Sequence, residues 1–154
     1  MWQELYRMVI HYLLRLGLSH ADAEDIAQET LLSTYLHLDS IQEGKLKSYA
    51  LAAARNKYID FLRKNKKEFT VSVIGDFCIK NFSEIYQIEN KEILKKALSN
   101  LNLTEQKLFY MKYNLGMTNK EISSLFDTSP DSVKTMLWRL RKKVKEYLEE
   151  EAKS

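Results

Sequence analysis

The chain has little cysteine, proline or glycine and no long hydrophobic run. Its 154 residues include one cysteine, one proline and four glycines. A single cysteine excludes an internal disulfide and offers no set of metal ligands, so we expect a reducing, cytoplasmic setting and no metal or other cofactor. The scarcity of proline and glycine argues against a loop-rich β fold. The apolar residues near the start are interrupted by His11 and Arg15, so we expect neither a signal peptide nor insertion into a membrane.

Charge is small in total but unevenly distributed. The formal net charge is +3, and the apolar fraction of 45% is ordinary for a globular protein. Acidic residues gather at positions 22–29, whereas basic residues dominate positions 55–67. Such segregation is typical of a chain that offers one surface to a protein partner and another to phosphate groups.

Apolar residues recur at three- and four-residue steps along most of the chain, which predicts an all-α fold. In a first domain, residues 1–65, we expect helices at about 5–16, 21–38 and 45–64. A polar loop at 39–44 precedes the third helix. The expected core of the second helix includes Ile26, Leu31, Leu32 and Tyr35.

The helical pattern decays between residues 66 and 84, where apolar side chains are scattered among Thr, Ser, Gly and Asp. We interpret this segment as a flexible linker that contains Cys78. Helices resume in a second domain, residues 85–154. The predicted architecture is therefore two small helical domains joined by a linker.

The second domain ends with start signals for two closely spaced helices. Thr118 and Glu121 predict a capping box, and Ser129 followed by Pro130 predicts the start of the next helix. The short connection between them is typical of a helix-turn-helix, whose second helix enters the DNA major groove. That second helix is rich in Lys and Arg, so the pair predicts DNA binding. Its expected inward residues are Val133, Leu137 and Leu140. Trp138 is interpreted as core, packed against the first helix of the pair, with a position along the DNA backbone as the alternative.

Three stretches together resemble the extracytoplasmic-function (ECF) sigma factors, the small two-domain promoter-specificity subunits of bacterial RNA polymerase. Residues 22–35 are similar to the family's acidic helix, which docks on the polymerase β′ subunit. Residues 53–64 resemble the helix that recognises the −10 element, and the C-terminal pair resembles the domain that reads the −35 element. The resemblance implies a non-enzymatic protein that binds core polymerase through β′ and β, directs it to promoter DNA and assists melting. It also implies control by an anti-sigma factor.

Each stretch supplies candidate contacts. Exposed carboxylates suit a basic protein partner, Lys and Arg suit phosphates, and Asn suits a base edge. We expect Asp60 to pair with a neighbouring Arg, and the resemblance implies that loop 39–44 accepts a flipped base. Asp127 replaces the Gly usual in the family's turn, which Asp tolerates because it can adopt the left-handed conformation. The candidates are Asp25, Gln28, Glu29 and Leu32 for polymerase; Arg55, Asn56, Lys57, Arg63 and Lys64 for the −10 element; and Ser129, Pro130, Asp131, Ser132, Lys134, Thr135, Arg139 and Arg141 for the −35 element.

Two other classes of protein account less well for the sequence. A helix-turn-helix transcriptional regulator that acts without a stable polymerase complex accounts for the C-terminal pair. It leaves residues 1–64 unexplained, because they lack the βα alternation of a receiver domain. An enzyme is disfavoured because His11, His20 and His37 are dispersed and there is no Gly-rich phosphate loop.

Overall fold

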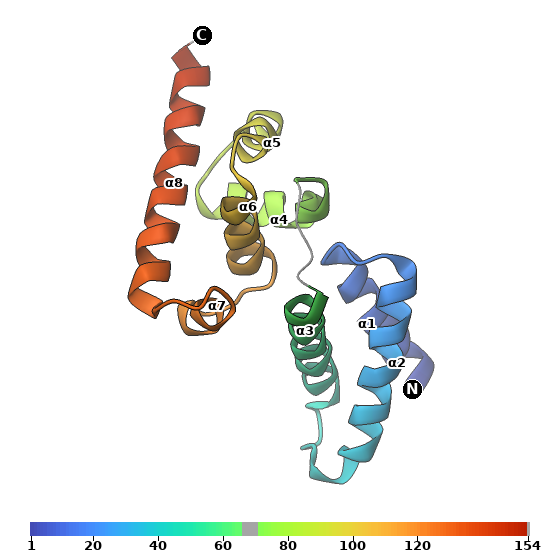
Figure 1. Cartoon of the computed structure of the whole chain (residues 1–154). Helices are drawn as coiled ribbons and strands as arrows, with labels where there is room; N and C mark the ends of the chain where they lie inside the picture. Colours follow the sequence, from blue (N-terminus) through green and yellow to red (C-terminus); the bar gives the residue numbers. More distant parts are fainter. Residues whose placement is uncertain (66–70, 154) are drawn as a thin grey trace. The chain divides into compact units, whose positions relative to one another are not determined.

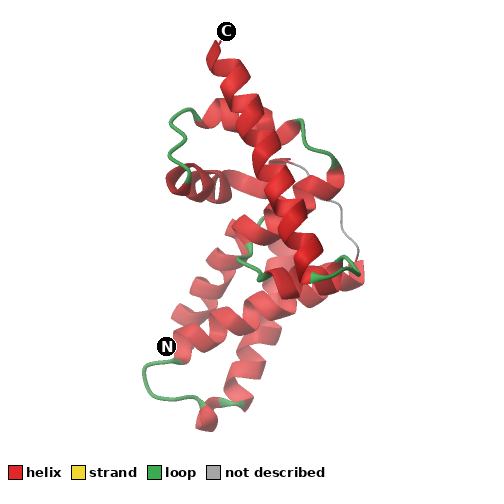
Figure 2. Ribbon diagram, turned by 90° about the vertical axis from the view of Figure 1, so that its left-hand side faces the viewer, coloured by secondary structure: helices red, strands yellow, loops and turns green. Residues whose placement is uncertain are grey.

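The computed structural model describes residues 1–65 and 71–153, and every regular element in these ranges is a helix (Figures 1 and 2). The chain divides into two compact units, residues 1–67 and 68–154. The predicted all-α class and the presence of two helical units are confirmed. The two units are described separately below.

The first unit is a bundle of three helices, α1 (Trp2–Arg15), α2 (His20–Leu36) and α3 (Leu46–Asn65), each of which packs on the other two. The hydroxyl of Ser19 accepts a hydrogen bond from the Asp22 N–H at 3.2 Å, which caps the start of α2. A short 3-10 turn, Leu38–Ser40, follows α2. The core of this unit combines large side chains of α1, including Leu5, Val9 and Leu13, with small ones of α2 and α3, including Ala23, Ala27, Ala50 and Ala54, which are completely buried.

The second unit contains five α-helices. They are α4 (Val71–Ile85), α5 (Lys91–Ser99), α6 (Leu103–Phe109), α7 (Asn119–Leu125) and α8 (Pro130–Lys153). A π-helical turn, η2 (Tyr110–Asn114), extends α6, and Gly116 after it has the left-handed φ of 64°. The long helix α8 packs on α5, α6 and α7.

Helix α4 corrects the interpretation of residues 66–84 as a linker. From Val71 onward the segment is helical, and it packs on α5 and η2. Phe82 is buried, with its ring centroid 5.0 Å from that of Phe109 and 4.8 Å from that of Tyr113. The helical period was hidden because α4 is kinked at Gly75, where φ is 76° and ψ is 164°. The remaining part of the predicted linker, residues 66–70, lies outside the described residues.

The reactivity of the Cys78 thiol can be used to test whether α4 is packed against the rest of the unit. Its side chain is fully buried, and burial raises the pKa of the thiol to about 12. At about pH 8, roughly one thiol in ten thousand is then ionised, and only the thiolate attacks a disulfide reagent. We expect Ellman's reagent to modify the native protein at least about tenfold more slowly than the protein in concentrated guanidinium chloride. Equal rates in the two conditions would show that α4 does not shield Cys78.

Candidate functional site

The helix-turn-helix begins with the predicted capping box. The Thr118 hydroxyl accepts a hydrogen bond from the Glu121 N–H at 3.1 Å, and the Glu121 carboxylate accepts one from the Thr118 N–H at 3.0 Å. Asp127 has a φ of 50°, so it adopts the expected left-handed conformation between α7 and α8. The Ser129 hydroxyl accepts a hydrogen bond from the Ser132 N–H at 3.1 Å and starts α8. These local signals separate α7 from α8, and α7 packs beside the N-terminal end of α8 (Figure 1).

The two faces of α8 separate core residues from candidate DNA contacts. Val133, Leu137 and Leu140 are buried, as predicted. The exposed face includes the residue before α8 and the first two turns of the helix, and Arg139 extends that face by one more turn. The candidates on it are Ser129, Pro130, Asp131, Ser132, Lys134, Thr135 and Arg139.

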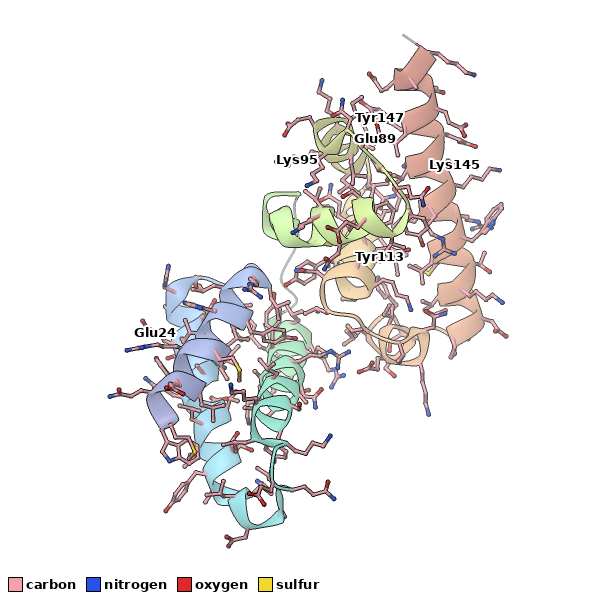
Figure 3. All side chains as sticks on the ribbon, turned by 180° about the vertical axis from the view of Figure 1, so that it is seen from behind. Glu24, Glu89, Lys95, Tyr113, Lys145 and Tyr147 are labelled. Atoms are coloured by element: carbon pink, nitrogen blue, oxygen red, sulfur yellow. The ribbon has the colours of Figure 1, made fainter. Side chains whose placement is uncertain are left out.

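Arg141 differs from the other −35 candidates because it is half-buried. Its guanidinium donates a hydrogen bond to the Tyr113 hydroxyl at 3.3 Å, so it turns toward the body of the unit. Tyr113 lies beside α4 (Figure 3), and its own burial raises the pKa of its hydroxyl to about 12. Tyr113 therefore remains a neutral hydrogen-bond partner for Arg141 at physiological pH.

The interpretation of Trp138 as core is wrong. Its side chain is 56% exposed, and the Lys142 Nζ lies 5.1 Å from the centroid of its ring. Trp138 follows the buried Leu137, and one residue turns an α-helix by about 100°, which carries the indole off the core face. It lines an apolar groove of about 610 Å³ together with Phe82 of α4 and Tyr86, the residue that directly follows α4.

Helix α3 presents most of the −10 candidates outward. Asn56, Arg63 and Lys64 are exposed, and Lys57 is half-buried. The Arg63 guanidinium lies 3.3 Å from the Asp60 carboxylate, which confirms the expected pairing of Asp60 with a neighbouring Arg. Arg55 is half-buried, and its charge lowers the pKa of Tyr12 in α1 against the larger raising effect of burial. Arg55 is therefore close enough to Tyr12 for its charge to act on that hydroxyl.

Helix α2 carries an exposed stripe formed by Asp25, Gln28, Glu29 and Leu32, the four polymerase candidates. The expectation that Leu32 and Tyr35 belong to the core is wrong, because they are 61% and 60% exposed. Leu36, which is 70% exposed, lies one turn beyond Leu32 and extends the stripe with a further apolar residue. The four-residue step from Leu32 to Leu36 is a signal in the sequence that was overlooked.

The acidic stripe and the basic helix meet in a polar groove between α2 and α3, which we call the α2–α3 groove. Its volume is about 370 Å³. Residues assigned to two different partners thus line one depression. The lining residues are Asp22, Asp25, Ile26, Glu29, Lys57, Asp60, Phe61 and Lys64.

Two segments of the chain match known families. Residues 1–68 match the family described as Sigma-70 region 2, and residues 91–144 match the family described as Sigma-70, region 4. The chain is 34% identical over 149 residues to the ECF RNA polymerase sigma factor SigM of Bacillus subtilis (strain 168). The alignment covers 92% of this chain and 91% of SigM. The chain belongs to the ECF sigma factor family.

This ECF sigma factor has a further relative in the RNA polymerase sigma factor SigV of the same strain. The two are 26% identical over 151 residues, covering 97% of this chain and 87% of SigV. The chain also aligns with the sigma factor RpoE from Bartonella quintana, solved in complex with the anti-sigma factor NepR. That alignment has a TM-score of 0.39 and 18% identity, and it covers 96% of this chain and 93% of RpoE.

The matched segments place the helices within the sigma factor. Region 2 includes α1, α2 and α3, and hence the acidic stripe, the α2–α3 groove and the −10 candidates. Region 4 begins at residue 91 and includes the helix-turn-helix, whereas α4 lies between the two matches. In residues 1–65 and 71–153, no helix is long and apolar enough to cross a bilayer, and no group of His, Cys, Asp and Glu is arranged to hold a metal.

Neighbouring substitutions on α8 test the assignment of its faces. Leu137→Ala should lower the free energy of unfolding by about 2–5 kcal/mol, because it leaves a cavity in the core. Trp138→Ala removes an exposed side chain and should change that free energy by less than about 1 kcal/mol. Urea unfolding followed by circular dichroism measures both. A loss at Trp138 as large as that at Leu137 would contradict the observed orientation.

Proposed function

We propose that this ECF sigma factor binds core RNA polymerase and directs it to promoters by recognising −10 and −35 elements. The observation that carries the proposal is the presence, in one chain and in the family's order, of a region 2 bundle and a region 4 helix-turn-helix. Each unit presents the candidate residues mainly on exposed helix faces. A helix-turn-helix regulator that acts without polymerase would have no use for the region 2 bundle.

The proposed polymerase contact is the exposed stripe of α2. Asp25 and Glu29 suit cationic side chains of the β′ subunit, while Leu32 and Leu36 add apolar area that polymerase would cover. Tyr35 packs edge-on against Trp2, with 5.9 Å between ring centroids, and widens this apolar end. The mixture of charge and apolar area supports a protein partner more than a nucleic acid.

The proposed −10 contact combines α3 with the loop before it. Lys57, Arg63 and Lys64 would hold phosphates, and the exposed Asn56 would read a base edge. Loop 39–44 would accept a flipped base, and this contact would keep the separated strand from pairing again. The Arg63–Asp60 pair is exposed, so a phosphate can compete for the guanidinium at little free-energy cost.

The proposed −35 contact is the first half of α8. The helix start at Ser129 suits a phosphate, Lys134 suits a phosphate at the edge of the major groove, and Thr135 suits the groove itself. Arg139 would grip the backbone further along. Tyr113 would fix the direction of Arg141, so that this cation reaches DNA only at the edge of the interface.

Catalysis would belong to the polymerase, since sigma factors are non-enzymatic, and action in the cytoplasm follows from that partnership. We also propose control by an anti-sigma factor, as family membership implies. Such an inhibitor would act by covering surfaces that polymerase needs.

Core polymerase mixed with the purified chain should give specific run-off transcripts on genomic fragments. Absence of any specific transcript, with tight binding to duplex DNA, would favour the regulator instead.

Charge reversal tests the polymerase contact. Asp25→Lys with Glu29→Lys should abolish co-purification with core polymerase, because two attractive contacts become repulsive. Glu4→Lys with Glu24→Lys makes the same change in net charge at exposed positions outside the stripe, and it should leave co-purification intact. Retained binding by the first variant would contradict the assignment.

A single substitution tests the −35 contact. Lys134→Ala should weaken binding of the polymerase complex to −35-dependent promoters by about threefold to tenfold and reduce the salt dependence by about one phosphate contact. Lys91→Ala, at the start of α5, is the matched control. Filter binding over a range of salt concentrations gives both quantities. Unchanged affinity and slope would remove Lys134 from the interface.

A further inference from the structure

The apolar groove beside Trp138, which we call the α4–α8 groove, is large enough for a small molecule. Its volume of about 610 Å³ falls in the range of small-molecule sites, about 300–1,000 Å³. It lies within the second unit, and its apolar walls include Phe82, Tyr86, Trp138 and Leu148. Tyr86 and Trp138 are 46% and 56% exposed, so part of this apolar surface is open to solvent. An exposed apolar surface with a polar rim is typical of a binding site.

The charged side chains of the α4–α8 groove all have the same sign. Three cations line it, Arg141, Lys142 and Lys145, and none of its described lining residues is acidic. Within residues 71–153, no ion pair joins these three side chains to a carboxylate. Arg141 is half-buried, and its guanidinium donates a hydrogen bond to the neutral Tyr113 hydroxyl at 3.3 Å. An anion stabilises such a cation, because burial removes part of its hydration. The groove therefore favours an anionic ligand.

The apolar walls restrict the kind of anion. Inorganic phosphate would meet the cations but leave the apolar walls uncovered. A second copy of α8 would bring the same cations against each other, which is repulsive. From Trp138 to Leu148, α8 rises about 15 Å, which is comparable to the length of an extended fatty-acid chain. The groove therefore suits a ligand with one acidic group and a long apolar body.

We propose that the α4–α8 groove binds a free long-chain carboxylate. The hydrocarbon chain packs on Phe82, Tyr86 and Leu148, and the carboxylate pairs with Arg141, whose planar guanidinium can hold both oxygens. A guanidinium has five N–H donors, so Arg141 can bind the carboxylate and keep its hydrogen bond to Tyr113. This site goes beyond the proposed function, since neither polymerase binding nor promoter recognition uses a small molecule.

The fluorescence of Trp138 tests the proposal. The chain has two tryptophans, so Trp2→Phe leaves Trp138 as the single indole. Sodium decanoate, added to the full chain below its micelle concentration, should change the emission of Trp138 saturably, at one carboxylate per chain. Decanol has the same chain without the charge, and it should bind at least about tenfold more weakly because it cannot pair with Arg141. Equal affinities, or no saturable change with decanoate, would overturn the proposal.

Substitution of Arg141 tests which side chain holds the carboxylate. Arg141→Gln should weaken decanoate binding about tenfold and leave decanol binding unchanged. Lys96→Gln, at an exposed position of α5 outside the groove, is the charge-matched control and should change neither. Equal losses in the two variants would show an effect of net charge alone and contradict the site.

Arg141 is half-buried, so a second pair of variants covers the case in which Arg141→Gln loses helicity by circular dichroism. Lys142→Gln with Lys145→Gln removes the two exposed cations of the groove, and decanoate binding should weaken. Lys91→Gln with Lys96→Gln makes the same change in net charge on α5 and should leave binding intact. Equal affinities of the two double variants would contradict the site.

Other occupants of the groove would give different results. A membrane site would shift the emission of Trp138 with phosphatidylglycerol vesicles but not with decanoate. A site for a protein segment would bind a glutamate-rich amphipathic peptide but not decanoate. Either result would overturn the proposal. Failure of run-off transcription would instead overturn the proposed function, and the decanoate titration, which contains neither DNA nor polymerase, is independent of that result.

Discussion

The close packing of α2 on its two neighbours is the constraint on which region 2 depends. The buried face of α2 consists of Ala23, Ala27, Thr30 and Thr34, all completely buried, with Ile26 at its edge. Small side chains let neighbouring backbones approach closely. The two threonine hydroxyls donate to the carbonyls of the residues four positions earlier, Ile26 and Thr30, both at 2.7 Å, so no buried hydroxyl needs a partner from another helix. The bulky residues of α2 are left for its outer face.

That arrangement explains why the core of region 2 was only partly predictable. Helical spacing identified the helices, but it assigned Leu32 and Tyr35 to the core because bulky apolar residues usually lie inside. Here alanine and threonine do so instead, and the exposed leucines are free for a partner. The stripe of Asp25, Gln28, Glu29 and Leu32 is exposed and so accessible to a partner, and its contact with polymerase stays a prediction.

In the second unit, local chemistry was predictable and tertiary packing was not. The capping box at Thr118 and the start of α8 at Ser129 depend on neighbours three residues away, so the sequence states them directly. Helix α4 depends on Phe82 meeting Phe109 and Tyr113, which lie about thirty residues further along. A helix kinked at Gly75 has no long regular pattern, and its packing on α5 and η2 depends on contacts that are distant in the sequence.

The internal partners of the cations bear on how a basic chain avoids indiscriminate DNA binding. Lys143 of α8 lies 2.9 Å from the Glu105 carboxylate, Arg141 is turned to Tyr113, and Arg63 is paired with Asp60. The two ion pairs are weak enough for a phosphate to displace them, yet they lower the charge that the free chain presents to DNA. Tyr113 is neutral, so it affects only the direction of Arg141. Electrostatic attraction alone carries no sequence information, so a chain whose cations were all free would bind promoters and other DNA alike. Because some cations of α3 and α8 have internal partners, each helix alone presents less charge to DNA. Selectivity then depends on both helices contacting one promoter at once, while polymerase would hold both.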